Sequence, residues 1–185
     1  MGKVIWHFTM SLDGFMADDR DSLDWGLRDA GGVPMGMAIV PNLGAIIAGR
    51  RTYDVGIRDP DGKPYGGEYV GPIFILSHRP APTDAPAGLV FADTLPKVLA
   101  VARDAAGDRD IAILGASTGR QLLEAGEVDE VLVHVAPILI GSGVPAFALG
   151  SPRVREFDVL ERSQPSDMSS LRLRPRHVKH EEESS

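Results

Sequence analysis

Short apolar runs alternate along the chain with segments of helical periodicity. The runs are bounded by glycine, proline or polar residues, which is typical of strands. Strands are therefore predicted at 3–10, 43–48, 72–77, 89–91, 111–114 and 130–136. Because several runs are apolar at every position, the strands are expected to be buried on both faces, in a sheet with helices on each side.

Two segments between the predicted strands have the spacing of amphipathic helices. In the first, apolar residues recur at i, i+3, i+4 and i+7 from Leu95, and Gly107 ends the pattern. The second is predicted at 117–125. It joins the strands at 111–114 and 130–136, so this unit is interpreted as a right-handed βαβ crossover.

The pattern changes after Gly150. Residues 155–162 and 168–174, with a turn at 164–167 between them, predict an antiparallel hairpin. Leucine alternates with arginine in its second strand, which indicates one buried face and one face in water. The polar residues 176–185 are expected to form a frayed tail.

Composition narrows the function classes. The chain has 185 residues, which predicts one domain, assigned to 1–175. It has no cysteine, which excludes disulfides, thiolate nucleophiles and cysteine-based metal sites. Its net charge of −7 argues against a nucleic-acid partner. With no signal-peptide pattern and no apolar run near ~18 residues, we expect a cytoplasmic protein with no membrane partner.

The first motif, Ser-Leu-Asp-Gly-Phe-Met-Ala at 11–17, directly follows the first predicted strand. Gly14 permits a sharp turn or a close approach of backbone to ligand. Asp13 is able to accept hydrogen bonds from backbone amides or to hold a polar substrate. An Asx turn that only closes the strand explains the segment equally well.

The second motif places Gly49, Arg50, Arg51 and Thr52 where a buried strand ends and a helix is predicted to begin. Free amides at a helix start attract anions, and arginine and hydroxyl groups add donors. The helix dipole disfavours arginine at this position, so the pair favours a bound anion over a solvated basic turn.

The third motif, Ser77, His78 and Arg79, follows the next predicted strand and offers donors but no acid. A site for NAD usually places a carboxylate on the ribose hydroxyls, whereas arginine accommodates the additional phosphate of NADP. The motif therefore favours NADP, although His78 alone is more typical of an ordinary loop.

The fourth motif runs from a strand through small residues into a helix, an arrangement in which amides meet a diphosphate. Its residues are Gly115, Ala116, Ser117, Thr118 and Gly119. It lacks the full G-x-G-x-x-G spacing, and a plain strand-to-helix turn has the same appearance. A fifth segment, 137–145, carries Gly141 and Gly143, which serve either a ligand or tight packing.

Two further features concern the remaining polar residues. The five histidines are scattered, and His7 and His134 are expected to be satisfied residues within the sheet. With no H-E-x-x-H or G-x-S-x-G motif, no metal site and no serine hydrolase are predicted. The loop 57–71 contains Tyr65 and Tyr69, which either line a pocket or belong to a surface excursion.

Taken in order, these motifs resemble the dihydrofolate reductase-like superfamily, in the branch that contains the reductase domain of bacterial riboflavin biosynthesis. The matching segments are Ser-Leu-Asp-Gly-Phe, Gly-Arg-Arg-Thr-Tyr, Ile-Leu-Ser-His-Arg, Leu-Gly-Ala-Ser and Val-Asp-Glu-Val-Leu-Val-His-Val-Ala-Pro-Ile-Leu-Ile-Gly-Ser-Gly. The resemblance covers roughly 3–175. It implies an α/β fold, with a mixed, mostly parallel eight-stranded sheet flanked by helices and closed by an antiparallel hairpin.

The resemblance also implies NADPH as the hydride donor. Residues 49–52 would hold phosphates, 77–79 would lie near the 2′-phosphate of the adenosine, and 115–119 would cradle the diphosphate. Asp13, Gly14 and Phe15 would lie beside the nicotinamide and the substrate, with Asp13 or water supplying a proton. Family members usually carry Gly-Gly, often in a cis peptide, where this chain has Gly115-Ala116.

The function expected from the residues and the resemblance is an NADPH-dependent reductase acting on a C=N or carbonyl group of a small conjugated heterocycle. One alternative is the riboflavin-pathway 5-amino-6-(5-phosphoribosylamino)uracil reductase, and another is a non-catalytic NADP(H)-binding or sensing protein. A homodimer is also expected, with the apolar strand at 131–136 or its neighbours at the interface.

Overall fold

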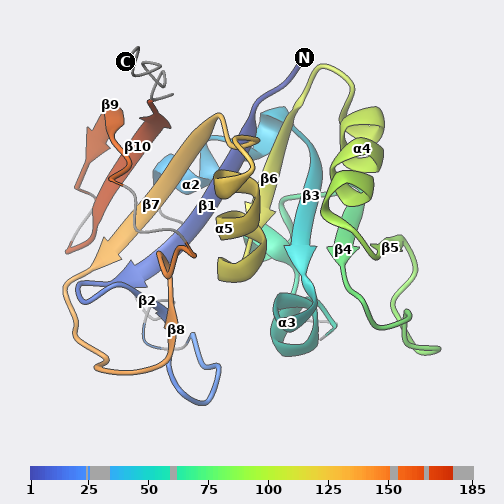
Figure 1. Ribbon diagram of the computed structural model, residues 1–185, viewed down its shortest axis with the longest axis horizontal. Coiled ribbons are helices and arrows are strands. Elements are labelled where there is room, and N and C mark those ends of the chain that lie inside the picture. Colours follow the sequence, from blue (N-terminus) through green and yellow to red (C-terminus); the bar gives the residue numbers. More distant parts are fainter. Residues whose placement is uncertain (24, 26–33, 59–61, 151–153, 165–166, 177–185) are drawn as a thin grey trace, which may run out of the picture.

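A computed structural model describes residues 1–23, 25, 34–58, 62–150, 154–164 and 167–176. Its main feature is an eight-stranded sheet (Figure 1). In order across the sheet, the strands are β5 (Leu89–Ala92), β4 (Ile73–Leu76), β3 (Leu43–Gly49), β6 (Asp110–Leu114), β1 (Val4–Ser11), β7 (Glu130–Ala136), β10 (Ser169–Pro175) and β9 (Phe157–Ser163). Every strand predicted from the sequence is confirmed.

Strand direction follows the predicted division of the chain. The strands from β5 to β7 pair in parallel, and β10 pairs antiparallel with both β7 and β9. The connection from β6 to β7 is parallel, as predicted, but β1 lies between these two strands. The mixed, mostly parallel sheet with a C-terminal hairpin is therefore confirmed.

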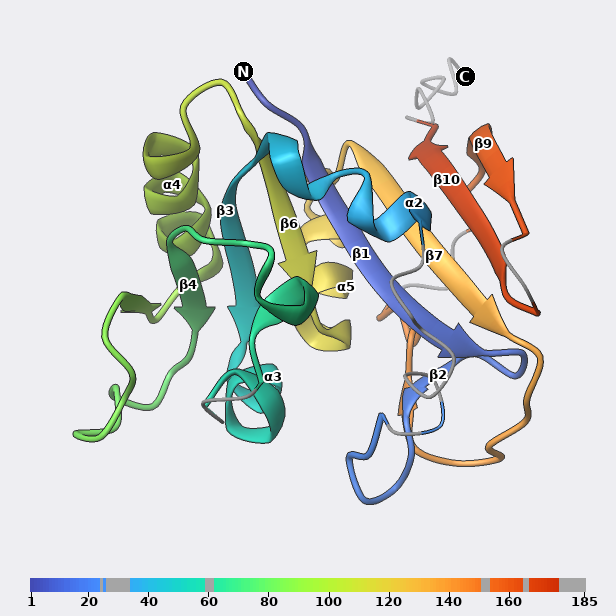
Figure 2. The same cartoon turned by 180° about the vertical axis from the view of Figure 1, so that it is seen from behind.

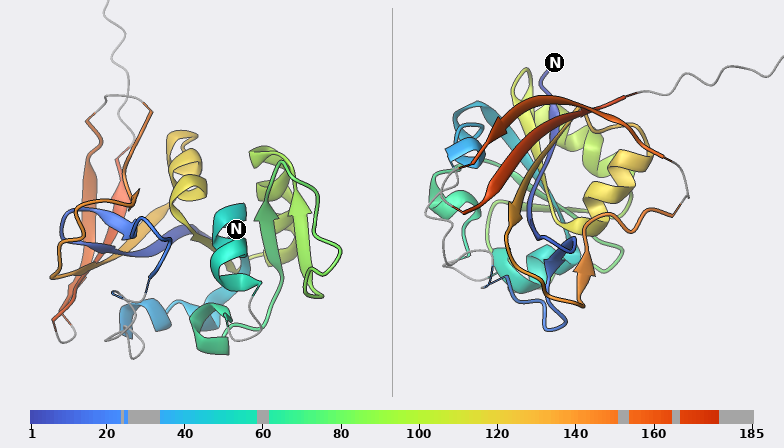
Figure 3. Two further views of the ribbon diagram at one scale, coloured as in Figure 1. Left: turned by 90° about the horizontal axis from the view of Figure 1, so that it is seen from below. Right: turned by 90° about the vertical axis from the view of Figure 1, so that its left-hand side faces the viewer.

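Helices cover both faces of the sheet (Figures 1 and 2). The predicted helices are α4 (Leu95–Ala106) and α5 (Ala116–Glu124), which stand on one face. On the other face lie α2 (Pro34–Met37) and the short 3₁₀ turns η1 (Val40–Asn42) and η3 (Pro64–Gly67). Viewed from below, α4 and α5 lie together on one side of the sheet (Figure 3).

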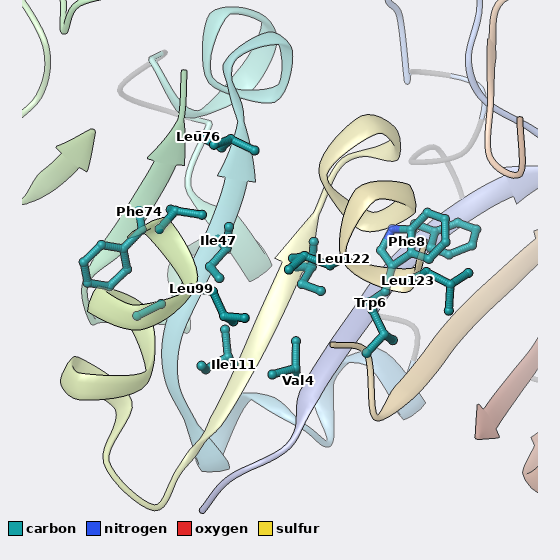
Figure 4. Close-up of a cluster of buried hydrophobic side chains, with 14 of the residues drawn as sticks. Val4, Trp6, Phe8, Ile47, Phe74, Leu76, Leu99, Ile111, Leu122 and Leu123 are labelled. Carbon is teal, nitrogen blue, oxygen red and sulfur yellow. The ribbon is translucent and has the colours of Figure 1, made fainter. Parts of the chain in front are cut away.

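The larger core fills the space between the sheet and the helices α4 and α5 (Figure 4). Trp6 is fully buried there, with its ring 4.6 Å from that of Phe8, centroid to centroid. The backbone of α5 approaches closely at Gly119, where any Cβ atom would overlap the Trp6 indole. This contact seats α5 on β1, and thereby fixes where the helix begins.

Several short elements were not predicted. β2 (Phe15–Ala17) and β8 (Val144–Pro145) form a two-stranded antiparallel sheet below β1. Segments of two or three residues are too short to show periodicity. In the loop 57–71, the aromatic rings turn toward the protein rather than toward solvent, since Tyr69 is buried and donates to the Pro72 carbonyl at 3.0 Å.

Some sequence-based predictions fall outside the described residues, namely 165–166 of the hairpin turn and 177–185 of the tail. The assignment of 1–175 as one domain stays a prediction. Among the residues that the structure describes, no helix is long and apolar enough to cross a membrane.

Candidate functional site

Two helices begin side by side at the carboxyl edge of the parallel strands. Ala48 of β3 pairs with Leu114 of β6, so the glycines that follow them come to the same edge of the sheet. Gly49 precedes α3 (Arg50–Thr52), which continues as the π-helical segment η2 (Tyr53–Ile57), and Gly115 precedes α5. Neither helix start has a side-chain cap. Uncapped amides at two adjoining helix starts form a place suited to an anion.

The two glycines allow these helix starts to approach each other. Gly115 has a φ of +103°, a conformation that side chains rarely adopt, and a Cβ there would overlap the Thr52 hydroxyl. Conversely, a Cβ on Gly49 would lie 2.7 Å from Thr118 Oγ1. Each glycine thus faces the threonine hydroxyl of the other helix start. The bond between Gly115 and Ala116 is trans.

Within the fourth motif, the side chains take different directions. Ser117 is exposed, whereas Ala116 and Thr118 are buried and Gly119 packs on Trp6. Within this motif, the exposed side chain of Ser117 and the uncapped amides at the start of α5 are therefore the groups that a ligand could meet. The placement of Gly119 serves packing, and its role in binding stays a prediction.

The second and third motifs meet through an acidic residue that the sequence analysis did not select. Arg50 Nε donates to Asp54 Oδ1 at 2.9 Å, and Arg79 donates to Asp54 Oδ2 at 2.8 Å. Ser77 is buried, and its Oγ accepts from Arg50 at 3.4 Å and donates to the Arg79 carbonyl at 2.8 Å. His78 is exposed. The structure therefore brings together the residues that follow β3 and those that follow β4, but it places a carboxylate between the two arginines.

The charges of this cluster are already paired within the chain. Partial burial alone would raise the pKa of the Asp54 carboxyl, but the hydrogen bonds and positive charges of Arg50 and Arg79 outweigh it and lower the pKa. Arg51 points elsewhere and pairs with Asp21 on the loop after β2. Any anion that binds here must therefore exchange with Asp54 or share the arginines with it.

Asp13 holds two loops together beside the end of β1. Its carboxylate accepts from Ser11 Oγ at 2.5 Å and from the Gly141 amide at 2.8 Å. The Ser11 bond lowers the pKa of the Asp13 carboxyl, slight burial raises it, and the Gly141 and Ile140 amides lower it further. The carboxylate therefore ties the loop after β1 to the segment at 140–141, and the predicted catalytic role of Asp13 stays a prediction.

The neighbours of Asp13 complete this corner. Gly14 has a φ of +86° with open space around its Cα, and its carbonyl accepts from the Ala146 amide at 2.8 Å. Phe15 is half-buried and pairs with Pro145 across the small sheet. Gly143 packs against the backbone of Ala17, so it serves tight packing. The predicted substrate residues thus lie on one braced corner below β1.

The face of the sheet opposite α4 and α5 carries a chain of polar groups, of which His134 and Ser170 are buried and His7 and Tyr65 are partly buried. His7 Nδ1 lies 2.9 Å from Tyr65 Oη, the Nε2 atoms of His7 and His134 are 2.9 Å apart, and His134 Nδ1 lies 2.7 Å from Ser170 Oγ. Burial, and then the neighbouring histidine, lower the pKa of His7 to about 3, and burial lowers that of His134 to about 4. The prediction that both are satisfied sheet residues is confirmed.

The sheet order bears on one of the surfaces named for the expected homodimer, while the homodimer itself stays a prediction. The strand at 131–136, proposed as part of a dimer interface, belongs to β7, which lies between β1 and β10 and is almost wholly buried. It has no free edge and no exposed face to offer a second copy. Among its neighbours in the hairpin, β9 forms the edge of the sheet, with Val159 and Leu160 exposed.

Comparison with known proteins identifies the family. The model of the RibD C-terminal domain matches residues 2–180. The chain belongs to this family. This agrees with the resemblance inferred from the motifs. A search of the curated proteins found no match.

Solved structures support the same assignment. A putative riboflavin biosynthesis protein from Shewanella sp. PV-4 is 26% identical, with a TM-score of 0.78 over 95% of this chain and 99% of that one. Dihydrofolate reductase from Enterococcus faecalis, complexed with NADP(H) and RAB-propyl, shares the fold at 13% identity, with a TM-score of 0.66 over 95% and 98% of the two chains.

A third structure is larger than this chain. It is the diaminohydroxyphosphoribosylaminopyrimidine deaminase/5-amino-6-(5-phosphoribosylamino)uracil reductase from Thermotoga maritima, which shares the fold at 16% identity. The TM-score is 0.65, and the alignment covers 94% of this chain but 56% of the other. The dihydrofolate reductase-like fold predicted from the sequence is confirmed.

Proposed function

We propose that this protein is an NADPH-dependent reductase that reduces a C=N or carbonyl group of a small conjugated heterocycle by hydride transfer. The observation that carries the proposal is the pair of uncapped helix starts at Gly49 and Gly115, flanked by Arg50 and Arg79. Family membership and the NADP(H)-bound dihydrofolate reductase neighbour support NADPH as the coenzyme.

The residues present fit such a coenzyme. Gly115 lets Thr52 approach the start of α5 closely, and the amides there have no side-chain cap, so they would hold the diphosphate. The amides of residues 50–52 adjoin them across the strand ends. Arg50 and Arg79, with Ser77 and His78 beside them, would hold the 2′-phosphate.

When bound, NADPH supplies the hydride, so the protein's contribution is position and exclusion of water. Asp13 would position the loops beside the substrate, because its carboxylate ties residues 11–15 to Ile140 and Gly141. Gly14 and Phe15 on this corner would contact the substrate. Asp13 or a water molecule would supply the substrate's proton.

The riboflavin-pathway reductase remains the alternative within enzymes. The Shewanella and Thermotoga neighbours favour it. Its substrate carries a phosphate of its own, which requires cations beyond those proposed for the coenzyme. Because Arg50, Arg51 and Arg79 are engaged as described, the cluster offers no spare arginine for that phosphate.

The proposal is tested in two steps. First, NADPH is titrated into the protein and its fluorescence is followed. Binding in the micromolar range is expected, and no binding at millimolar coenzyme would contradict the proposal. Second, the absorbance of NADPH is followed with a panel of pyrimidines, pterins and quinoid compounds. Steady oxidation with one of them supports a reductase, whereas tight binding without turnover across the panel would favour a sensing protein.

A further inference from the structure

The carboxylate of Asp54 lies between the two arginines on which the proposed 2′-phosphate site depends. Its two oxygens are used separately, Oδ1 by Arg50 at 2.9 Å and Oδ2 by Arg79 at 2.8 Å. Asp54 comes from η2, directly after α3, while Arg79 comes from the turn after β4. A carboxylate is thus held where two guanidinium groups converge.

Arg50 keeps its position by other contacts as well. Its guanidinium donates to Ser77 Oγ at 3.4 Å and to the Pro80 carbonyl at 3.2 Å, and it lies 5.5 Å above the centre of the Tyr53 ring. Only 19% of its side chain is exposed. Loss of the Asp54 contact would therefore leave one cation of the site in place.

The Asp54 contacts themselves are exchangeable. The side chain of Asp54 is 34% exposed and that of Arg79 is 65% exposed. Ion pairs in such surroundings contribute little to the stability of a fold, so a competing anion is able to displace the carboxylate at little cost in stability. Two guanidinium groups that converge on one anion also have the geometry that binds phosphate.

The cluster combines features of two coenzyme sites. A carboxylate near the ribose accepts a hydrogen bond from the 2′-hydroxyl of NADH, whereas arginine neutralises the 2′-phosphate of NADPH. Arg50 and Arg79 supply two positive charges, and Asp54 cancels one of them. The 2′-phosphate, close to a dianion, would meet a site with half of its cationic charge already neutralised.

We propose that Asp54 is an internal anion in the subsite for the 2′ group of the coenzyme, and that it sets the preference between NADPH and NADH. This inference rests on the proposed function. In the NADPH complex, the phosphate displaces Asp54 from Arg50 and Arg79; in the NADH complex, Asp54 keeps its arginines and accepts the ribose hydroxyl. The wild-type protein therefore binds both coenzymes, with a restrained preference for NADPH.

The test compares dissociation constants for NADPH and NADH, measured by fluorescence titration at one ionic strength. Asp54→Asn removes the charge and keeps the shape. It is expected to raise the preference for NADPH about tenfold, which corresponds to ~1.4 kcal/mol. Asp158→Asn is the matched control, because Asp158 is an exposed carboxylate paired with Arg176 at the far edge of the sheet. This control is expected to change the preference less than twofold.

A second variant tests the same subsite by the opposite change in charge. Arg79→Gln removes one cation while Asp54 remains, so it is expected to move the preference toward NADH. If Asp54→Asn leaves the preference unchanged in a protein that still binds NADPH, the role of Asp54 is overturned and the coenzyme site stands. If the wild-type protein binds neither coenzyme, the proposed function fails and this inference fails with it.

Discussion

Two carboxylates in this protein are each held between two cations, but in different surroundings. Glu130 on β7 accepts from Lys3 at 2.7 Å and from Arg172 at 2.6 Å, and its side chain is 1% exposed. Asp54 has a similar pair of partners, but its side chain is 34% exposed. Burial commits Glu130 to the fold, because its charge has no access to water. Exposure leaves Asp54 free to exchange partners, which is what a ligand site requires.

Among the substitutions, the largest expected loss of stability follows from neutralising Glu130, the buried carboxylate of the two. Glu130→Gln leaves Lys3 and Arg172, which are 48% and 25% exposed, without their anionic partner, and is expected to lower the free energy of unfolding by about 2 kcal/mol. Asp54→Asn is the matched exposed change and is expected to cost less than about 1 kcal/mol. Urea unfolding of both variants measures this difference. Equal losses would show that burial does not separate the two carboxylates.

The next effect concerns the backbone of the site rather than its charges. Gly115→Ala forces a side chain into a left-handed conformation and against Thr52, so NADPH affinity is expected to fall at least tenfold, or ~1.4 kcal/mol. Gly126→Ala is the control, since Gly126 has a φ of +74° with nothing within 4 Å of the added Cβ. The control is expected to lose about 1 kcal/mol of stability and no affinity. If Gly115→Ala binds NADPH as tightly as the wild-type protein, the start of α5 does not contribute to the coenzyme site.

Acid titration of His7 and His134 tests the stability of the fold without a substitution. Their pKa values in the folded protein are about 3 for His7 and about 4 for His134, below the usual 6.5. Between pH 6.5 and 5, the unfolded chain therefore binds protons that the folded protein does not. As the pH is lowered through this range, the free energy of unfolding should decrease by up to about 1.4 kcal/mol per pH unit for each histidine.

Urea unfolding at pH 7, 6 and 5 checks this slope. His134→Gln keeps a donor and an acceptor at the position but does not titrate, so its slope should be about half that of the wild-type protein. A wild-type stability that is flat over this range would contradict the buried neutral pair. This pH range separates the effect of the histidines on stability from that of Asp13 and Asp54. The pKa values of these two carboxyl groups are lowered, so they affect stability only at more acidic pH.

The smallest effect is expected at the exposed clamp of Asp13. Asp13→Asn keeps the shape of the side chain but weakens its bonds to the amides of Ile140 and Gly141. Hydrogen exchange of those two amides should accelerate by about three- to tenfold, while the amides of β1 stay protected. Unchanged exchange would show that Asp13 does not hold the two loops together.

Features that depend on neighbouring residues in the sequence were predicted better than contacts between residues far apart in the chain. The strands and the helices α4 and α5 were predicted because hydrophobic periodicity is local. The glycine-bearing strand ends at Gly49 and Gly115 were also recognisable, since each is a contiguous strand-to-helix turn. The elements β2 and β8 were missed because a few residues carry no period.

Contacts that depend on sheet order were beyond local patterns. Asp54 and Arg79 are separated by 25 positions, and they meet only because β3 and β4 are neighbours. His7 and His134 are 127 positions apart and meet because β1 lies between β6 and β7. The third motif offered no acid of its own, but Asp54 follows Arg50 by four positions, a spacing that pairs opposite charges on a helix. The contact of Asp54 with Arg50 therefore had a local signal, whereas its contact with Arg79 had none.

The central claim is that the adjoining helix starts at the ends of β3 and β6 bind a dinucleotide coenzyme. A crystal structure of the protein with NADPH tests it most directly. The account predicts the diphosphate against the amides of residues 50–52 and 116–118, with the 2′-phosphate between Arg50 and Arg79. A coenzyme bound elsewhere, with Asp54 still joined to both arginines and the two helix starts empty, would contradict it.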